Sequence, residues 1–363
     1  MFELPKYIGP DFSQARFKDC PSVTLKAVVK EGVAPEYFHS TSMFPEYFKV
    51  EGTWLLAEES RMDSTVIFKD NKLEVVEARN LKEGDLVILG RSENGEEGIY
   101  VHTTGFTAEE NGLEDKFVFR TGRSRETAFS RDYDKLYELL KYEKEHGNVL
   151  FVMGPAVAFD NDSRASMQYL IENGYCDGLL AGNALATHDL EAAYFRTALG
   201  QNIYTQESVP NGHYNHLDVI NKIRSCGSIP SFIAKEKIHD GIIYAMNKCN
   251  KPFVLCGSIR DDGPLPEVVG NVYEGQGAMR NLIKKATTVI CLATQLHTIA
   301  TGNITPSFRK VDGEIRPIYI YSVDISEFAT NKLKDRGSLS ATGIITNVQD
   351  FVVNVAKALG FKG

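Results

Sequence analysis

The stretch 177-DGLLAGNALATHDLE-191 decides the fold of this chain, because it reads as a strand, a glycine turn and a helix in immediate succession. An apolar run over 179–181 stops at Gly182, which we interpret as the start of a tight turn. A helix is expected from Thr187, and its first turn would carry two polar side chains, His188 and Asp189. A strand that turns into a helix N-terminus presents free backbone N–H groups to a phosphate or a dinucleotide. The stretch therefore predicts a nucleotide site at this turn.

Length and composition indicate an ordinary globular protein of two domains. The chain has 363 residues, of which 43% are hydrophobic and 24% are charged, as is usual for soluble domains. Its formal net charge of -8 argues against a nucleic-acid partner, because such proteins usually carry a basic surface. No apolar run approaches the roughly 18 residues of a membrane span, and the start MFELPKYIGPDF lacks the apolar core of a signal peptide. We therefore expect a cytoplasmic protein without a membrane partner.

The cysteines and histidines do not predict a metal site. The six cysteines lie at positions 20, 176, 226, 249, 256 and 291, and none of them form the CxxC pair that marks zinc and thioredoxin sites. Several lie in apolar runs, where cysteine behaves as a small hydrophobic residue, so we expect free thiols in a reducing compartment. His213 and His216 have the spacing HxxH, but no third ligand follows at metal spacing. We interpret both histidines as solvated or capping side chains.

The first part of the chain, residues 1–128, is predicted to be a β-rich domain. Short segments of alternating polarity are separated by turn signals such as 82-KEGD-85 and 93-ENG-95. Trp54 is interpreted as a core residue of this part. The expected strands are 23–29, 52–56, 64–68, 85–89 and 97–102.

The second part, residues 129–363, is predicted to be an α/β domain with a doubly wound parallel sheet. Strands and helices alternate along it, and runs such as VLFVM and IYIYSV are apolar throughout, as in strands covered on both faces. The expected strands are 148–153, 177–182, 252–257, 288–293 and 317–323. The expected helices are 130–147, 164–173, 187–199, 214–226, 235–250, 277–286 and 348–359.

Polar or glycine-rich loops follow each of these predicted strands. In an open parallel sheet, ligands bind outside the carboxyl ends of the strands. One such loop is common in any α/β protein, but five together favour a cofactor crevice that includes Gly182 and Gly257. Asp324 ends the last of the five strands and is suited to accept hydrogen bonds from a ribose diol, or to cap the next helix. The loops follow Met153, Gly182, Cys256, Ala293 and Val323.

The GxGxxG fingerprint of a standard dinucleotide-binding domain is absent from the sequence. The nearest match is 275-GQG-277, with Arg280 where the third glycine would stand. A lone GxG is a weak signal, and it fits the start of a helix as well as a pyrophosphate cradle. The sequence therefore supports a related nucleotide fold with a different glycine loop.

Several side chains near these loops have the chemistry of catalysis or substrate binding. Cys256, at a strand end, is either a nucleophile or proton carrier, or a buried hydrophobic residue. The adjacent Asp261 and Asp262 could hold a substrate amine, and one of them could act as a general base. Arg120 and Arg123 suit a substrate carboxylate through their planar guanidinium groups, or else belong to a solvated interdomain linker.

These motifs resemble those of the LOR/SDH-type proteins, which include archaeal ornithine cyclodeaminases and the C-terminal part of cyanobacterial arginine dihydrolase fusions. The matching pieces are 51-EGTWLLAEESRMDSTVIF-68, 179-LLAGNALATHDLE-191, 256-CGSIRDDGPLPEVV-269 and 294-TQLH-297. The resemblance implies a tightly held NAD in a deoxyhypusine-synthase-like α/β domain, in agreement with the missing fingerprint. Carried over residue by residue, it implies NAD contacts at Asn183, Ala184, Asp262, Thr294, Gln295, Leu296 and His297.

The reaction that the resemblance implies is the conversion of L-ornithine to L-proline and ammonia. NAD would take a hydride from Cα, the δ-amine would attack the resulting imine, ammonia would leave, and the hydride would return to the cyclic imine. Such a site binds one carboxylate and one amine, and the protein is expected to be a homo-oligomer. Two other classes stay open: an NAD-dependent amino-acid dehydrogenase of the saccharopine or lysine type, which would release NADH, and a non-catalytic NAD-binding sensor.

Overall fold

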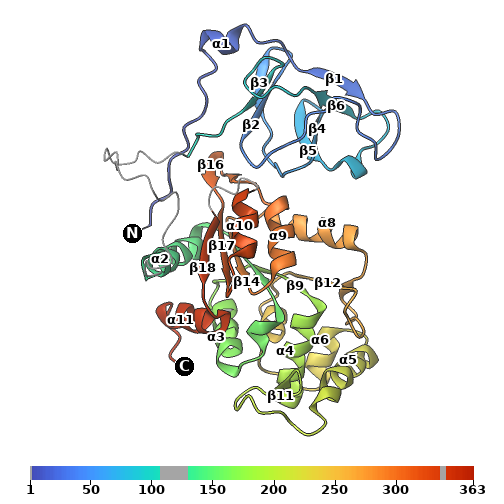
Figure 1. The fold of residues 1–363 in the computed structure, drawn as a ribbon, viewed down its shortest axis with the longest axis vertical. Helices are drawn as coiled ribbons and strands as arrows, with labels where there is room; N and C mark the ends of the chain where they lie inside the picture. Colours follow the sequence, from blue (N-terminus) through green and yellow to red (C-terminus); the bar gives the residue numbers. More distant parts are fainter. Residues whose placement is uncertain (1, 107–129, 336–340) are drawn as a thin grey trace.

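A computed structural model describes residues 2–106, 130–335 and 341–363 of the protein. Residues 2–106 form a β-rich part, and the residues from 130 onward form an α/β part with a parallel sheet (Figure 1), so the predicted fold class is confirmed. The predicted boundary between residues 128 and 129 lies outside the described residues and stays a prediction. No helix in the described ranges is long and apolar enough to cross a membrane.

Two antiparallel sheets make up the β-rich part, with strand orders β1-β6-β4-β5 and β3-β2-β7. The five predicted strands are present, and the sequence reading missed β2 and β5. All five residues of β2 are buried, including Glu46 and Lys49, so the strand shows no alternation of polar and apolar residues. The strands are β1 (Thr24–Ala27), β2 (Glu46–Val50), β3 (Thr53–Leu56), β4 (Thr65–Lys69), β5 (Lys72–Val76), β6 (Leu86–Leu89) and β7 (Ile99–Val101), and one short helix, α1 (Ala15–Lys18), precedes them.

The core of the β-rich part forms between its two sheets. Phe48 from β2, Val66 from β4 and Ile88 from β6 are fully buried and belong to one apolar cluster. Trp54, which the sequence reading placed in the core, is half-buried and stacks on Phe12 at 4.6 Å between ring centroids.

A seven-stranded, fully parallel sheet is the centre of the α/β part, with strand order β13-β12-β9-β8-β14-β17-β18. The chain leaves β8 in one direction, through β9, β12 and β13, and then returns to the other side of β8 to place β14, β17 and β18. The sheet is therefore doubly wound, with its switch point between β8 and β14. The strands are β8 (Val149–Met153), β9 (Gly178–Gly182), β12 (Phe253–Cys256), β13 (Val268–Val269), β14 (Thr288–Leu292), β17 (Tyr319–Asp324) and β18 (Ala341–Ile345).

Helices cover both faces of this sheet, and successive strand residues point to opposite faces. Phe151 faces the larger apolar cluster under α2, α3, α4, α5, α6, α7 and α11, whereas Leu150 and Val152 face the cluster under α8, α9 and α10. The helices are α2 (Ser130–His146), α3 (Asn161–Glu172), α4 (Asn183–Phe195), α5 (Asn215–Cys226), α6 (Ile229–Lys235), α7 (Ile242–Lys248), α8 (Val272–Ile283), α9 (Gln295–Ile304), α10 (Phe328–Asp335) and α11 (Val348–Ala358). Two short hairpins, β10 (Thr197–Ala198) with β11 (Gln201–Asn202) and β15 (Phe308–Val311) with β16 (Glu314–Pro317), complete the part.

Three helix predictions are wrong at their boundaries. The helix expected from Thr187 starts at Asn183, directly after β9, so the strand runs into α4 without an intervening turn. The single helix expected over 235–250 is replaced by α6 and α7, because Gly241 adopts a φ of 111° between them. The 275-GQG-277 motif lies inside α8, which starts at Val272, so it forms neither a helix start nor a strand-to-helix cradle.

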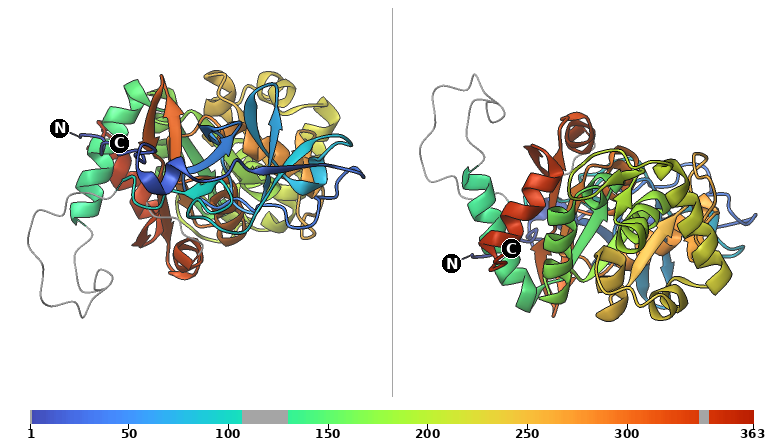
Figure 2. Two further views of the ribbon diagram at one scale, coloured as in Figure 1. Left: turned by 90° about the horizontal axis from the view of Figure 1, so that it is seen from above. Right: turned by 90° about the horizontal axis from the view of Figure 1, so that it is seen from below.

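The β-rich part is fixed to the side of the α/β part that carries α8 and α9. Arg280 on α8 donates to the backbone carbonyls of Glu59 (2.8 Å) and Ile304 (3.3 Å), and so joins the two parts. A backbone hydrogen bond from Ser307 to Met43 (2.8 Å) adds a second link. Seen from above, the β-rich part lies over the α/β part (Figure 2).

Candidate active site

The carboxyl ends of β8 and β14 meet at the switch point of the sheet. Gly154, directly after β8, donates its N–H to the carbonyl of Leu292 at 2.8 Å. A Cβ added to Gly154 would lie 2.0 Å from the carbonyl oxygen of Ala293, so only glycine allows the two loops to come this close. Ala293 itself has a φ of 45°, a left-handed conformation that costs free energy for a residue other than glycine and is often found at functional sites.

The two helices that begin at this edge, α4 and α9, have N-termini without a side-chain cap. Gly182 precedes α4 and Thr294 precedes α9, and neither supplies a capping hydrogen bond, nor does either helix carry an acidic residue in its first turn. Among helices of comparable length in the described chain, α3 is capped by Asp160 and α8 by Asn271, whereas α5 also lacks a side-chain cap but carries Asp218 in its first turn. The free N–H groups of an uncapped N-terminus and its positive dipole suit an anion.

These two N-termini lie against each other. A Cβ added to Gly182 would lie 3.2 Å from Cε1 of His297, which is in the first turn of α9. Gly182 has φ −88° and ψ 165°, an extended conformation open to any residue, so the demand for glycine here is one of space. The arrangement is a cradle of backbone N–H groups that a side chain at position 182 would fill, and it fits the pyrophosphate of a dinucleotide.

Asn183 and Ala184 form the first turn of α4, as the predicted nucleotide contact requires. The side chain of Asn183 is committed to the neighbouring loop: its Nδ2 donates to the carbonyl of Gly263 (3.1 Å) and its Oδ1 accepts from the N–H of Leu265 (3.0 Å). Asn183 is therefore available to a ligand through its backbone, and it holds the loop that carries Asp262. Ala184 is half-buried beside it.

The predicted contacts that follow β14, and the one at the end of β17, also lie at this edge. Gln295 and Leu296 are exposed in the first turn of α9, and burial lowers the pKa of His297, which keeps its imidazole neutral at pH 7. Asp324 ends β17 and is half-buried, and one of its carboxylate oxygens accepts from the N–H of Ser326 at 3.1 Å. This turn lies before α10, whose first N–H, that of Phe328, donates to the Ser326 hydroxyl, so the contact is not a cap of that helix. The ribose contact of Asp324 stays a prediction.

Cys256 and Gly257 follow β12 at the same edge. The Cys256 sulfur points to the face of α8, where a Cβ added to Gly275 would lie 3.0 Å from it, and it packs on the smaller apolar cluster. Burial raises the pKa of this thiol, which disfavours the thiolate that a nucleophile needs. A catalytic Cys256 stays a prediction. The N–H of Gly257 donates to the carbonyl of Val269 at 2.9 Å.

Asp261 and Asp262 have different surroundings in the loop after β12. Asp261 accepts from the N–H of Ser258 at 2.8 Å and so stabilises the turn. The Asp262 side chain is 68% exposed, and its carboxylate lies 3.4 Å from Nε2 of His216 on α5. Of the two, Asp262 is the one that a substrate can reach, and His216 is its partner rather than a solvated or capping side chain.

Arg120 and Arg123, the predicted partners of a substrate carboxylate, lie outside the described residues. Their role stays a prediction.

The sequence reading missed a buried carboxylate–imidazole pair on α4. Since α4 starts at Asn183, His188 and Asp189 lie in its second turn and do not serve its N-terminus. Nδ1 of His188 is 2.9 Å from Oε2 of Glu191, three residues further along the helix. The spacing HxxE on a helix brings two such side chains onto one face, and this was the available signal. Asp189 instead accepts from Arg164 at 2.9 Å, in the core.

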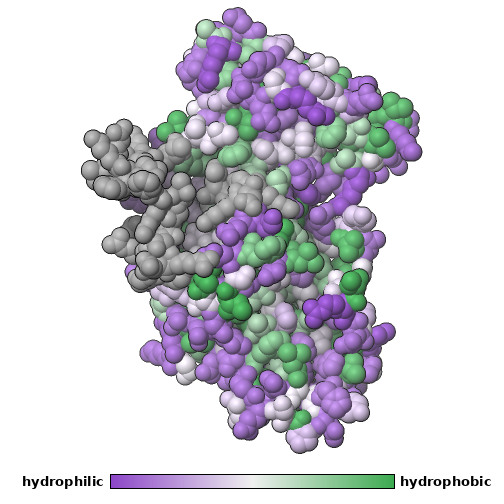
Figure 3. Space-filling model, in the orientation of Figure 1, coloured by the Kyte–Doolittle hydropathy of each residue, from purple (hydrophilic) through white to green (hydrophobic). Residues whose placement is uncertain are grey.

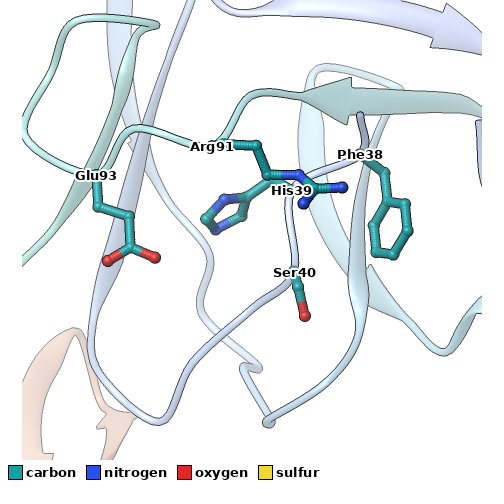
Figure 4. Close-up of a pocket in the computed structure, with 5 residues that line it drawn as sticks. All are labelled: Phe38, His39, Ser40, Arg91 and Glu93. Carbon is teal, nitrogen blue, oxygen red and sulfur yellow. The ribbon is translucent and has the colours of Figure 1, made fainter. Parts of the chain in front are cut away.

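A pocket of about 160 Å³ lies in the β-rich part (Figure 4). His39 is buried in its wall and is held by Glu46, with Nε2 2.9 Å from the carboxylate. Its lining residues are Phe38, His39, Ser40, Arg91 and Glu93.

Comparison with known proteins identifies relatives over nearly the whole chain. Residues 135–355 match the family model described as "Arginine dihydrolase ArgZ-like, C-terminal, Rossmann fold". The ornithine cyclodeaminase of Methanocaldococcus jannaschii is 37% identical over 351 residues, which cover 95% of this chain and 79% of that protein. A crystal structure of a conserved LOR/SDH protein from Methanococcus maripaludis superposes with a TM-score of 0.84 at 33% identity, covering 93% of this chain and 98% of that one. The ternary complex of AgrE with ornithine and NAD⁺ superposes with a TM-score of 0.59 at 30% identity, covering 94% of this chain and 46% of that one.

Proposed function

We propose that this chain, which belongs to the ornithine cyclodeaminase family, converts L-ornithine to L-proline and ammonia with NAD as a resident cofactor. The observation that carries the proposal is the pair of uncapped helix N-termini, α4 and α9, that lie against each other across Gly182. The complex of AgrE with ornithine and NAD⁺ supports the choice of both ligands, because that protein shares the fold.

The strand-end crevice would hold the cofactor mainly through the backbone. N–H groups at the start of α4 (Asn183, Ala184) and of α9 (Gln295, Leu296, His297) would meet its phosphates, with Gly182, Gly257 and Thr294 leaving room for the approach. Asp324 would accept from a ribose hydroxyl, and Asp262 would close the crevice from the loop after β12. When bound, NAD supplies a hydride acceptor that takes the Cα hydrogen of the substrate and later returns it.

The substrate has one carboxylate and two amines, and the chain offers a group of opposite charge for each kind. Arg120 or Arg123 would bind the carboxylate, since a guanidinium group can donate two parallel hydrogen bonds to it. Asp262, exposed and next to His216, would hold an amine, with Asp261 stabilising the loop beneath it. Cys256, whose pKa is raised by burial, would stay a protonated thiol at this edge.

We also propose a homo-oligomer of cytoplasmic location that contributes to proline biosynthesis. Exposed apolar side chains support association: Leu296 is 77% exposed and Ile325 78% exposed, both at the carboxyl ends of strands, and Phe328 on α10 is 50% exposed. Figure 3 shows apolar side chains gathered over α9 and α10 on this face. The six cysteines are all free, which accords with a reducing compartment.

Two measurements test this function. Mass spectrometry of the purified, denatured protein should show one NAD for each chain. Incubation with ornithine deuterated at Cα should give proline that keeps the label, with no lasting absorbance at the NADH wavelength, because the hydride is borrowed and returned. Accumulation of NADH would indicate a dehydrogenase instead, and cofactor binding without any proline would indicate a sensor.

A further inference from the structure

Three segments at the carboxyl edge of the sheet bring a group of titratable side chains together. We refer to His188, Glu191, His216 and Asp262 as the imidazole cluster. His188 and Glu191 come from α4, His216 from α5 and Asp262 from the loop after β12. The ring of Phe159, which follows β8, packs edge-on against His188 at 5.5 Å between centroids. The cluster is next to the proposed cofactor crevice, since Asn183 at the start of α4 is hydrogen-bonded to the loop that carries Asp262.

Glu191 is held as a hydrogen-bond acceptor. It is completely buried, and its Oε1 accepts from the Thr197 hydroxyl at 2.9 Å and from the N–H of Gly200 at 3.3 Å. The Thr197 hydroxyl is oriented in turn by Nδ2 of Asn215, which donates to it at 2.8 Å. A glutamate carboxylate is an acceptor-only group, and Oε1 already accepts from two donors, so the hydrogen bond between Oε2 and Nδ1 of His188 has the imidazole as donor.

That hydrogen bond fixes the tautomer of His188. With the proton on Nδ1, Nε2 carries the free lone pair of a general base. Within the described parts of the chain, Nε2 has no hydrogen-bond partner. The ring of His216 lies 6.1 Å away between centroids, and behind it stands the Asp262 carboxylate. A buried carboxylate that orients an imidazole, whose second nitrogen has no partner among the described residues, is the arrangement of a catalytic acid–base group.

The same side chains do not form a metal site. Across the described residues, no three His, Cys, Asp or Glu side chains are grouped so that they could hold a metal ion. Proton transfer is therefore the chemistry that the imidazole cluster offers.

We propose that His188 is the catalytic acid–base residue of the ornithine reaction and that Glu191 is its positioning residue; this inference rests on the proposed function. Before Cα is oxidised, the N–H bond of the substrate α-ammonium breaks and its proton passes to Nε2 of His188, which leaves a neutral amine and an imidazolium ion. The buried Glu191 carboxylate stabilises that cation. When the α-nitrogen departs after ring closure, the imidazolium returns the proton to it, so that ammonia leaves and neutral His188 is restored. Asp262 and His216 are left to bind the δ-ammonium and to accept the two protons that its nitrogen releases, the first before the neutral δ-amine attacks the imine carbon and the second as ammonia leaves.

The test compares His188→Gln and Glu191→Gln with His213→Gln, a matched change at an exposed histidine. Loss of a general base lowers turnover about a hundred- to ten-thousandfold. We expect a fall of that size in His188→Gln, a smaller fall with an altered pH profile of kcat/KM in Glu191→Gln, and parental activity in His213→Gln. NAD content, and the rise in Tm that ornithine produces, should be unchanged in His188→Gln, because binding does not need the proton transfer.

A second variant covers the case in which His188→Gln does not fold. His188→Ala leaves space for a free imidazole, and added imidazole should restore part of its turnover, which a merely structural histidine would not allow. Turnover of His188→Gln within threefold of the parent, or no restoration in folded His188→Ala, would overturn the proposal. If the parent makes no proline from ornithine, both the proposed function and the role of His188 are wrong. If the parent makes proline but the His188 variants do not behave as expected, only the role of His188 is wrong.

Discussion

Replacement of Gly182 by valine should empty the cofactor crevice while leaving the fold intact. The added Cβ would lie 3.2 Å from Cε1 of His297 and 3.8 Å from the Cys256 carbonyl oxygen. The first contact is closer than normal van der Waals packing, and the two γ-carbons of valine extend further into the space between α4 and α9. Because the backbone at Gly182 is extended, the change adds no conformational strain.

The size of the effect follows from the contacts that the side chain would block. Each charge-assisted hydrogen bond from a helix N–H to a phosphate oxygen contributes about 1.5–3 kcal/mol, so the loss of one raises the Kd for NAD roughly ten- to a hundredfold. Overpacking at the site lowers the free energy of unfolding by about 1–3 kcal/mol, and a domain of this size tolerates such a loss. Binding should therefore suffer far more than folding.

The assay is the nucleotide content of purified protein, with the Tm of the cofactor-free protein as the measure of folding. Gly277→Val is the matched control, because a Cβ added there meets no atom within 4 Å. We expect Gly182→Val to lose most of its NAD and Gly277→Val to keep it. Full retention of NAD in a folded Gly182→Val protein would refute the reasoning that places the pyrophosphate between α4 and α9.

Three further outcomes are expected. Asp262→Asn should lower turnover about ten- to a hundredfold by removing a charge-assisted contact to the substrate amine, whereas Asp261→Asn should have a smaller effect in the same steady-state assay; equal activities would make the loop purely structural. Burial holds the pKa of His297 below its ordinary 6.5. As pH falls, the unfolded chain therefore takes up a proton before the folded protein does, and the free energy of unfolding declines below about pH 6.5. Urea unfolding at pH 7.5 and 5.5 should show a smaller decline in His297→Gln than in the parent. Arg164→Met should cost about 3–5 kcal/mol in the free energy of unfolding, because it leaves the fully buried Asp189 carboxylate without its cation. Arg196→Met, at a pair that is 41% exposed on the arginine side, should cost less than about 1 kcal/mol.

The sequence predicted the parallel sheet because its central strands are continuously apolar. Runs such as 149–153 and 288–292 are buried on both faces, and their pattern has no other simple explanation. The edge strand β13 could not be predicted in this way, since it has two residues and both are half-buried. The start of α4 was placed four residues late because Gly182-Asn183 looks like a turn, although here the strand leads directly into the helix.

The sequence predicted those parts of the candidate site whose place follows from the ends of the strands. It missed those parts that depend on contacts between side chains. The loops after β9, β12, β14 and β17 meet at one edge in any doubly wound sheet, so Gly182, Asp262 and Asp324 could be assigned to it from strand order alone. The pairing of His188 with Glu191 depends on where α4 starts, and the link between Asp262 and His216 joins segments that are 46 residues apart. The HxxE spacing was a local signal for the first pair, whereas the contact between Asp262 and His216 follows from packing and has no signature in local sequence.

The missing GxGxxG motif has a physical explanation in this fold. In that motif one short segment supplies the tight turn, the close approach to the pyrophosphate and the close packing of helix on strand. Here the same demands fall on glycines in different loops: Gly154 allows the loops after β8 and β14 to come close at the switch point, and Gly182 opens the space between α4 and α9. Because the two positions are 28 residues apart in the sequence, no spacing rule brings them together. A cradle shared between two helices would also bind its ligand from both sides of the switch point, as expected for a cofactor that stays bound while a hydride leaves the substrate and returns to it.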